Sequence, residues 1–154
     1  MSTAVPSPSP AVSDLIIEIR QEIQVNAPIA TTFAALLEQL SSGFDKPDGT
    51  SMPLKLEARP GGRWYRDLGD DNGHYWGVVQ AIKRPTLLEF CGPMSMSLPV
   101  AGNIQYRLSE KDGGTLIKFH HLALGVFPAD HRQGLLRGWG HIHESARKRA
   151  ERKS

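Results

Sequence analysis

The sequence predicts an α+β fold in which a seven-stranded antiparallel sheet wraps around a long C-terminal helix. Six strand-like segments between residues 52 and 124 follow one another, mostly with short turn-forming separators, which is typical of an antiparallel meander. A seventh strand pattern lies near the N-terminus, and one long helical pattern closes the sequence. The apolar face of such a sheet must be covered, and this helix is the only predicted element large enough to cover it.

Composition indicates one globular domain. The chain has 154 residues, of which 40% are hydrophobic and 22% charged. The formal net charge of +2 favours no nucleic-acid partner, since the basic residues concentrate in "ARKRAERKS", the predicted solvated end of the last helix. A single cysteine, Cys91, excludes an internal disulfide framework, so we expect a cytoplasmic protein. No stretch approaches the ~18 apolar residues of a membrane span, and we expect no membrane partner.

The first segment, residues 1–13, is rich in proline and serine and lacks the basic start and apolar run of a secretory signal. We expect a disordered leader there, followed by a single domain over residues 14–152.

The domain begins with a strand and a helix. In "DLIIEIRQEIQV", residues 14–25, apolar and polar residues alternate except for an irregularity near Gln21. In "NAPIATTFAALLEQL", residues 26–40, the apolar spacing becomes helical. Asn26 is the expected N-cap, and Pro28 fits the first turn, where its missing N–H does no harm. A loop follows over residues 41–51.

The remaining strands are bounded by separators such as "PGG", "GDDNG" and "KDGG". They are "MPLKLEAR" (52–59), "GRWYRDL" (62–68), "HYWGVVQAIK" (74–83), "TLLEFCG" (86–92), "GNIQYRLSE" (102–110) and "GTLIKFHHLAL" (114–124).

The last helix is expected within residues 127–153, with one apolar stripe. Three glycines interrupt it at 134, 138 and 140, each weakening the helix by ~1 kcal/mol relative to alanine. Close approach to the sheet, room for a guest molecule or plain tolerance would each explain them. The stripe consists of Leu135, Trp139, Ile142 and Ala146.

Five motifs together resemble the helix-grip proteins of the START and birch-pollen-allergen (Bet v 1-like, SRPBCC) superfamily. They are "IQVNAPIATTFAALL", the "RPGGRW" strand, the "GVVQAIKRPTLLEF" pair, "GGTLIKFHHLAL" and "RGWGHIHE". Within that superfamily the chain is most similar to bacterial proteins grouped with the C-terminal domain of Hsp90 ATPase activators (AHSA-type). The resemblance covers residues 14 to about 152 and implies the helix-grip fold, a hydrophobic cavity and, by analogy, binding of a small apolar molecule.

Two departures from the family pattern fall at the expected mouth of that cavity. The stretch between Leu40 and Met52 is short and lacks the second small helix of many relatives. The loop "GPMSMSLPVAGN" between two strands is unusually rich in methionine.

Strand alternation suggests which side chains face the helix. We expect an aromatic box with a few polar points and a volume of a few hundred Å³, which is the usual make-up of a small-molecule site. The alternative is that these side chains simply pack as core. Tyr106 and Ile104 are harder to place, since the preceding loop can shift their register. The candidate ligand-binding residues are Trp64, Arg66, Leu88, Phe90, Tyr106, Phe119, His121, Trp139 and His143.

A charge on an apolar face needs a partner, so Arg66 should meet a ligand anion or, after a one-residue register shift, Glu57 or Glu89. The six histidines predict no metal site, because His120 and His121 point to opposite faces of a strand and His141 and His143 to different sides of a helix. No cofactor is expected, and no catalytic residue is assigned.

Three functions remain open. We expect, first, binding of a small hydrophobic or amphipathic molecule between sheet and helix. The alternative in the same pocket is a polyketide cyclase or aromatase-like enzyme, with His121 or His143 as acid or base, oriented by Glu89 or Asp67. The third is a co-chaperone-like protein-binding module, whose visible candidate surface is the basic stretch 147–153. A monomer and a homodimer are both compatible with the sequence.

Overall fold

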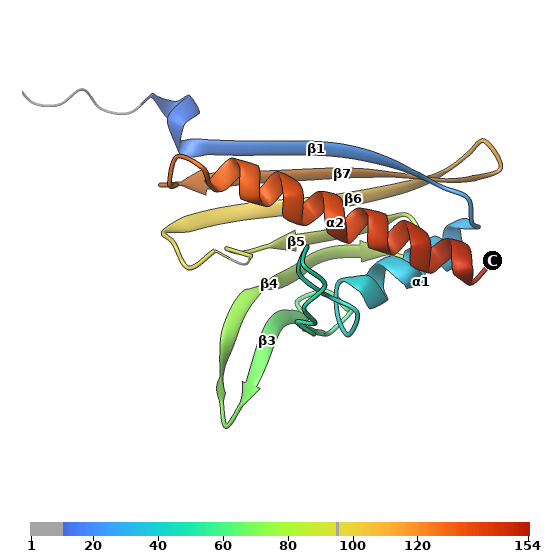
Figure 1. Ribbon diagram of the computed structural model, residues 1–154, viewed down its shortest axis with the longest axis horizontal. Helices are drawn as coiled ribbons and strands as arrows, with labels where there is room; N and C mark the ends of the chain where they lie inside the picture. The colour runs from blue at the N-terminus through green and yellow to red at the C-terminus, as the bar shows by residue number, and fades with distance from the viewer. Residues whose placement is uncertain (1–10, 95) are drawn as a thin grey trace, which may run out of the picture.

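The computed structural model describes residues 11–94 and 96–154, and its element order confirms the predicted α+β architecture (Figure 1). A single sheet of seven antiparallel strands has the order β1-β7-β6-β5-β4-β3-β2. The helix α2 lies across this sheet, and the shorter α1 packs beside α2. The elements are η1 (Val12–Leu15), β1 (Ile16–Val25), α1 (Ile29–Gln39), β2 (Lys55–Leu56), β3 (Arg63–Gly69), β4 (Asn72–Lys83), β5 (Leu87–Cys91), β6 (Val100–Lys111), β7 (Gly114–Gly125) and α2 (His131–Arg152).

The leader predicted over residues 1–13 lies largely outside the described residues. The short 3₁₀ helix η1 begins two residues inside that predicted leader.

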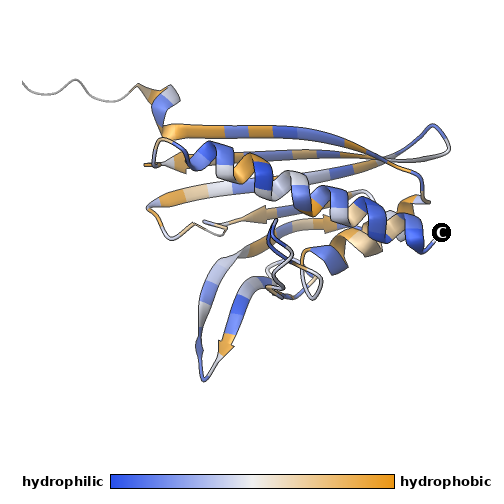
Figure 2. Ribbon diagram, viewed as in Figure 1, coloured by the Kyte–Doolittle hydropathy of each residue, from blue (hydrophilic) through white to orange (hydrophobic). Residues whose placement is uncertain are grey.

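Strand β1 pairs with β7 without interruption from Ile16 to Val25. The irregularity predicted near Gln21 is therefore wrong: Gln21 keeps the two-residue alternation and lies on the same face as the buried Ile19. The polar side chain breaks the apolar pattern because it has a polar partner on α2, described below. Figure 2 shows the alternation of apolar and polar residues along the strands.

Helix α1 begins differently from the prediction. Pro28, and not Asn26, occupies the N-cap position, and no side chain caps the helix there. Thr32 instead directs its hydroxyl to the carbonyl oxygen of Pro28, at 2.9 Å. The strand expected over residues 52–59 is also shorter, since only Lys55 and Leu56 pair with β3.

The hairpin of β3 and β4 extends away from the layer that α2 covers (Figure 1). Its pairing shifts by one residue between Trp64 and Tyr65, because Trp64 opposes Gly77 while Tyr65 opposes Tyr75. The extra residue, Trp76, is the bulge. Bulges bend the strand that contains them and re-aim side chains, which here separates the outer hairpin from the rest of the sheet.

Ion pairs fasten the C-terminal end of α2 to α1. Arg149 donates to Glu38 at 3.0 Å, and Lys153 contacts the same carboxylate. Arg147 pairs along its own helix with Glu144 and Glu151. None of the described helices combines the length and apolar composition needed to cross a membrane.

Candidate functional site

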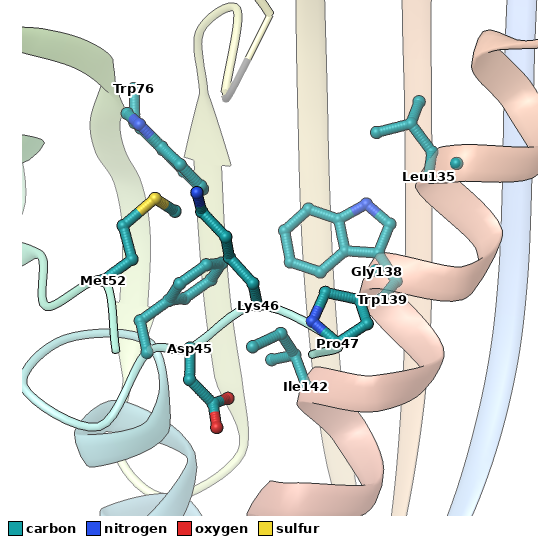
Figure 3. A pocket seen from close by; sticks show the side chains of 11 residues that line it. Asp45, Lys46, Pro47, Met52, Trp76, Leu135, Gly138, Trp139 and Ile142 are labelled. Carbon is teal, nitrogen blue, oxygen red and sulfur yellow. The ribbon is translucent and has the colours of Figure 1, made fainter. Parts of the chain in front are cut away.

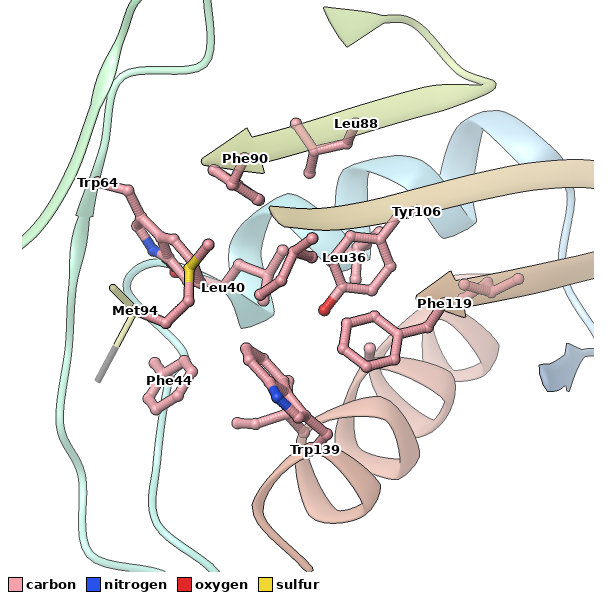
Figure 4. Close-up of a cluster of buried hydrophobic side chains, with 14 of the residues drawn as sticks. Leu36, Leu40, Phe44, Trp64, Leu88, Phe90, Met94, Tyr106, Phe119 and Trp139 are labelled. Atoms are coloured by element: carbon pink, nitrogen blue, oxygen red, sulfur yellow. Dashed lines mark hydrogen bonds between the residues drawn. The ribbon is translucent and has the colours of Figure 1, made fainter. Parts of the chain in front are cut away.

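Most of the space between the sheet and α2 is filled by aromatic side chains (Figure 4). Phe119 on β7 lies at the centre, with ring centroids 5.0 Å from Tyr106, 5.2 Å from Trp139 and 4.4 Å from His143. Nearer the outer hairpin, Trp64 stacks on Phe90 at 4.4 Å. These distances are those of packed aromatic pairs, so this part of the interface forms a core.

His143 joins that core through two hydrogen bonds. Its Nδ1 lies 2.6 Å from Oε1 of Gln21, and its Nε2 lies 2.9 Å from the hydroxyl of Tyr106. An amide oxygen can only accept, so Nδ1 carries the proton and Nε2 accepts from Tyr106. Burial lowers the pKa of His143 to about 3 and raises that of Tyr106. Both ring nitrogens of a neutral histidine are therefore occupied by protein partners.

His121 is also buried and neutral. The indole N–H of Trp139 donates to its Nδ1 at 3.1 Å, which leaves the proton on Nε2. Within residues 11–94 and 96–154, this Nε2 has no hydrogen-bond partner. Burial, with a smaller contribution from the neighbouring His120, lowers the pKa of His121 to about 4.

The structure brings eight of the nine predicted site residues together, all buried. Of these eight, only Trp139 lines the apolar pocket beside the N-terminal half of α2. The predicted aromatic box is thus largely closed upon itself, and the open space is smaller than the predicted few hundred Å³. The eight residues are Trp64, Leu88, Phe90, Tyr106, Phe119, His121, Trp139 and His143.

Arg66 is separated from the other eight, which corrects its predicted position beside the helix. It lies half-buried on the outer hairpin and lines a different depression, together with Asp67 and His74. Neither predicted carboxylate partner contacts it: Glu57 pairs with Arg63, at 2.8 Å, and Glu89 accepts a hydrogen bond from a glutamine of β6. The bend of the hairpin carries Arg66 away from α2.

An apolar pocket of about 170 Å³ opens between the N-terminal half of α2 and the loop that follows α1 (Figure 3). Trp76, the bulge residue of β4, forms one wall and Trp139 of α2 the other. Ring contacts at 5.1 Å hold Trp76 against both Phe44 and Trp64. The full lining is Phe44, Asp45, Lys46, Pro47, Met52, Trp76, Gly134, Leu135, Gly138, Trp139 and Ile142.

Two glycines spaced by four residues, Gly134 and Gly138, form part of the helix side of this pocket. A Cβ atom built at either position meets no neighbouring atom within 4 Å. Close packing against the sheet therefore does not require them, which removes one of the three explanations considered above. Gly140 is equally unhindered but lies outside the pocket.

The loop over residues 41–51 is fixed by hydrogen bonds although it contains no second helix. Met52 donates its N–H to the carbonyl oxygen of Phe44, and Lys46 donates its N–H to that of Thr50, both at 2.9 Å. The side chain of Asp45 lies 2.7 Å from Nε2 of His141, which ties the loop to α2. This loop lines the pocket, as expected from its predicted place at the mouth.

The second predicted mouth segment, the methionine-containing loop, packs inward. Met94 is fully buried beside Trp64 and Phe44 (Figure 4). Its backbone has a positive φ of 60°, and its N–H donates to the carbonyl oxygen of Trp76 at 2.8 Å. A left-handed conformation is costly for methionine, so its packing and this hydrogen bond must compensate.

Sequence reasoning missed most of the pocket wall. Phe44 and Met52 lie in or beside a loop without periodicity, and Trp76 becomes a wall only through the bulge. The available signal was the pair of glycines at 134 and 138. In the part of the chain that the structure describes, no three His, Cys, Asp or Glu residues gather as a metal site would require.

Comparison with known proteins identifies one matching family. The family described as "Activator of Hsp90 ATPase homolog 1-like protein" matches residues 26–148. No curated protein matches the chain.

Several solved structures share the fold at low sequence identity. A Rhizobium leguminosarum protein superposes with a TM-score of 0.67 at 18% identity, covering 89% of this chain and 95% of that one. Ara h 8.0201 gives a TM-score of 0.63 at 15% identity, with 88% and 97% covered. StfQ, a di-domain ARO/CYC from the steffimycin biosynthetic pathway, gives 0.65 at 14% identity, and the match spans 92% of this chain but 53% of StfQ.

Proposed function

Because the chain belongs to the activator of Hsp90 ATPase homolog 1-like family, whose helix-grip fold it shares, we propose that it binds a small, largely apolar molecule in the pocket between Trp76 and Trp139. The family and the fold are consistent with ligand binding and with cyclase-like roles. The proposed binding site is the open pocket, and not the closed aromatic box.

The observation that carries the proposal is the glycine surface of α2. Glycine in a helix costs ~1 kcal/mol relative to alanine, and neither Gly134 nor Gly138 has a neighbour that would exclude a side chain. A guest molecule that lies against the two glycines explains why the helix has glycine at these positions although glycine weakens it. Aromatic and aliphatic walls supply the apolar contact that small-molecule sites generally have.

The size of the pocket limits the guest. An apolar cavity of roughly 150 Å³ engineered in another protein accommodates benzene. The 170 Å³ found here therefore suits one aromatic ring or a short branched chain, with any longer part extending through the mouth.

The positions of the histidines give the cyclase alternative little support. The ring nitrogens of His143 are engaged by Gln21 and Tyr106, and neither His121 nor His143 lines the pocket. A general acid or base must lie within hydrogen-bond reach of the proton that it transfers. The basic stretch 147–153 also gives the protein-binding alternative little support. Most of its charge is already paired within the chain, through Arg147, Arg149 and Lys153.

The test is a titration of ¹⁵N-labelled protein with the neutral compound 3-phenylpropanamide, observed at the indole N–H signals of Trp76 and Trp139. We expect saturable shifts in the wild type and in Gly140→Leu, whose new side chain lies outside the pocket. Gly138→Leu should abolish them, because its side chain fills the space that the ring would occupy. Absent shifts in the wild type, or unchanged shifts in Gly138→Leu, would contradict the proposal.

A further inference from the structure

The pocket is apolar except at its mouth, where two charged residues of the loop line it, Asp45 and Lys46. Their situations differ. Asp45 already has a partner, His141, at 2.7 Å. Lys46 is exposed, and across residues 11–94 and 96–154 no carboxylate lies within ion-pair distance of its amino group.

The position of Lys46 is set by the backbone of the loop. Its N–H donates to the carbonyl oxygen of Thr50, and its own carbonyl oxygen accepts from Gly49 at 2.8 Å. From this turn its side chain extends across the pocket toward the ring of Trp76, whereas the carboxylate of Asp45 points away (Figure 3). The nearby Asp48 is held by the turn itself, where it accepts the N–H of Thr50 at 2.8 Å.

We propose that the guest is an amphipathic anion whose apolar body lies between Trp76 and Trp139 and whose carboxylate binds the ammonium group of Lys46 at the mouth. This inference rests on the proposed function of the same pocket and adds the chemical class of the ligand. A buried apolar body and a solvent-facing charge fit a pocket with an apolar floor and one available cation. The ion pair remains partly hydrated, so it selects between ligands and contributes only modestly to affinity.

Lys46 is therefore the cation that binds the ligand anion, a role that the sequence pattern predicted for Arg66. Both are cations beside aromatic side chains, but Arg66 lines the depression on the outer hairpin and Lys46 lines the pocket.

The test compares two compounds of nearly the same shape, 3-phenylpropanoate and 3-phenylpropanamide, in the same indole N–H titration at low ionic strength. We expect the carboxylate to bind roughly threefold to fivefold more tightly than the amide, as an exposed ion pair allows. Lys46→Gln should remove this preference, so that the carboxylate and the amide bind that variant with equal affinity, while Lys46→Arg should keep the preference. Added salt should reduce the preference, because it screens an exposed pair.

The outcomes separate the two proposals. Equal affinities of both compounds for the wild type, or a carboxylate preference that persists in Lys46→Gln, would overturn the anionic ligand while leaving apolar binding intact. If neither compound shifts the indole signals, the proposed function fails, and the anionic ligand fails with it.

Discussion

His143 on α2 donates a hydrogen bond from Nδ1 to Oε1 of Gln21 on β1, across 2.6 Å. This bond joins the long helix to β1, the edge strand of the sheet, at a partly buried position. It explains both the polar residue in the first strand and the histidine beside the apolar stripe of the helix. The pair is therefore part of the framework that holds the pocket, and it makes stability depend on pH.

The first prediction concerns that pH dependence. The pKa values of His143 and His121 are about 3 and about 4, against roughly 6.5 in an unfolded chain. Below pH 6.5 the unfolded state therefore binds more protons than the folded state, so stability falls as the pH falls. Each histidine contributes up to about 1.4 kcal/mol per pH unit between pH 6 and 5.

Urea unfolding at several pH values between 7.5 and 5 measures this loss. Carboxylates with lowered pKa values, such as Glu57, lose their contribution only at lower pH and do not interfere. In His143→Gln the slope should fall by about half. A free energy of unfolding that stays constant from pH 6.5 to 5 would show that the histidines are not buried as neutral groups.

The second prediction concerns the end of α1. The indole N–H of Trp64 donates to the carbonyl oxygen of Leu40 at 2.7 Å, in the interior. Trp64→Phe leaves that carbonyl unpaired and removes part of a packed ring, at a cost of about 2–4 kcal/mol in unfolding free energy. Trp76→Phe is the matched control, because the indole N–H of Trp76 has no partner among the described residues. Equal losses in the two variants would mean that the hydrogen bond contributes nothing.

The third prediction concerns the glycines of α2. Replacing Gly134, Gly138 or Gly140 with alanine should raise the free energy of unfolding by up to about 1 kcal/mol each, since alanine favours the helix and nothing obstructs its methyl group. Chemical denaturation measures the change. Destabilisation by any of the three would indicate a close contact that the structure does not contain.

The fold was predictable because its signals are local and periodic. The two-residue alternation of the strands, the turn-forming separators and the helical spacing after residue 130 each follow from backbone geometry. Gln21 is the instructive exception. Its polar side chain suggested an irregular strand, whereas the strand is regular and the exception lies in its partner on α2.

The site was predicted only in part, because it depends on how far the sheet stands from the helix. Strand alternation identified the inward-facing Phe119 and helical spacing identified Trp139, but neither pattern could show that the two rings fill the gap. The path of the loop that carries Lys46 has no periodicity. The bulge at Trp76 forms one wall of the pocket and turns the hairpin that carries Arg66 away from α2. This bulge has no unambiguous sequence signal.

The most direct test of the central claim is a crystal structure of the protein grown with 3-phenylpropanoate. We expect the phenyl ring between Trp76 and Trp139, against Gly138, with the carboxylate at the ammonium group of Lys46. A ring bound in the depression beside Arg66, or a pocket that stays empty at saturating ligand, would contradict the assignment of this pocket as the binding site.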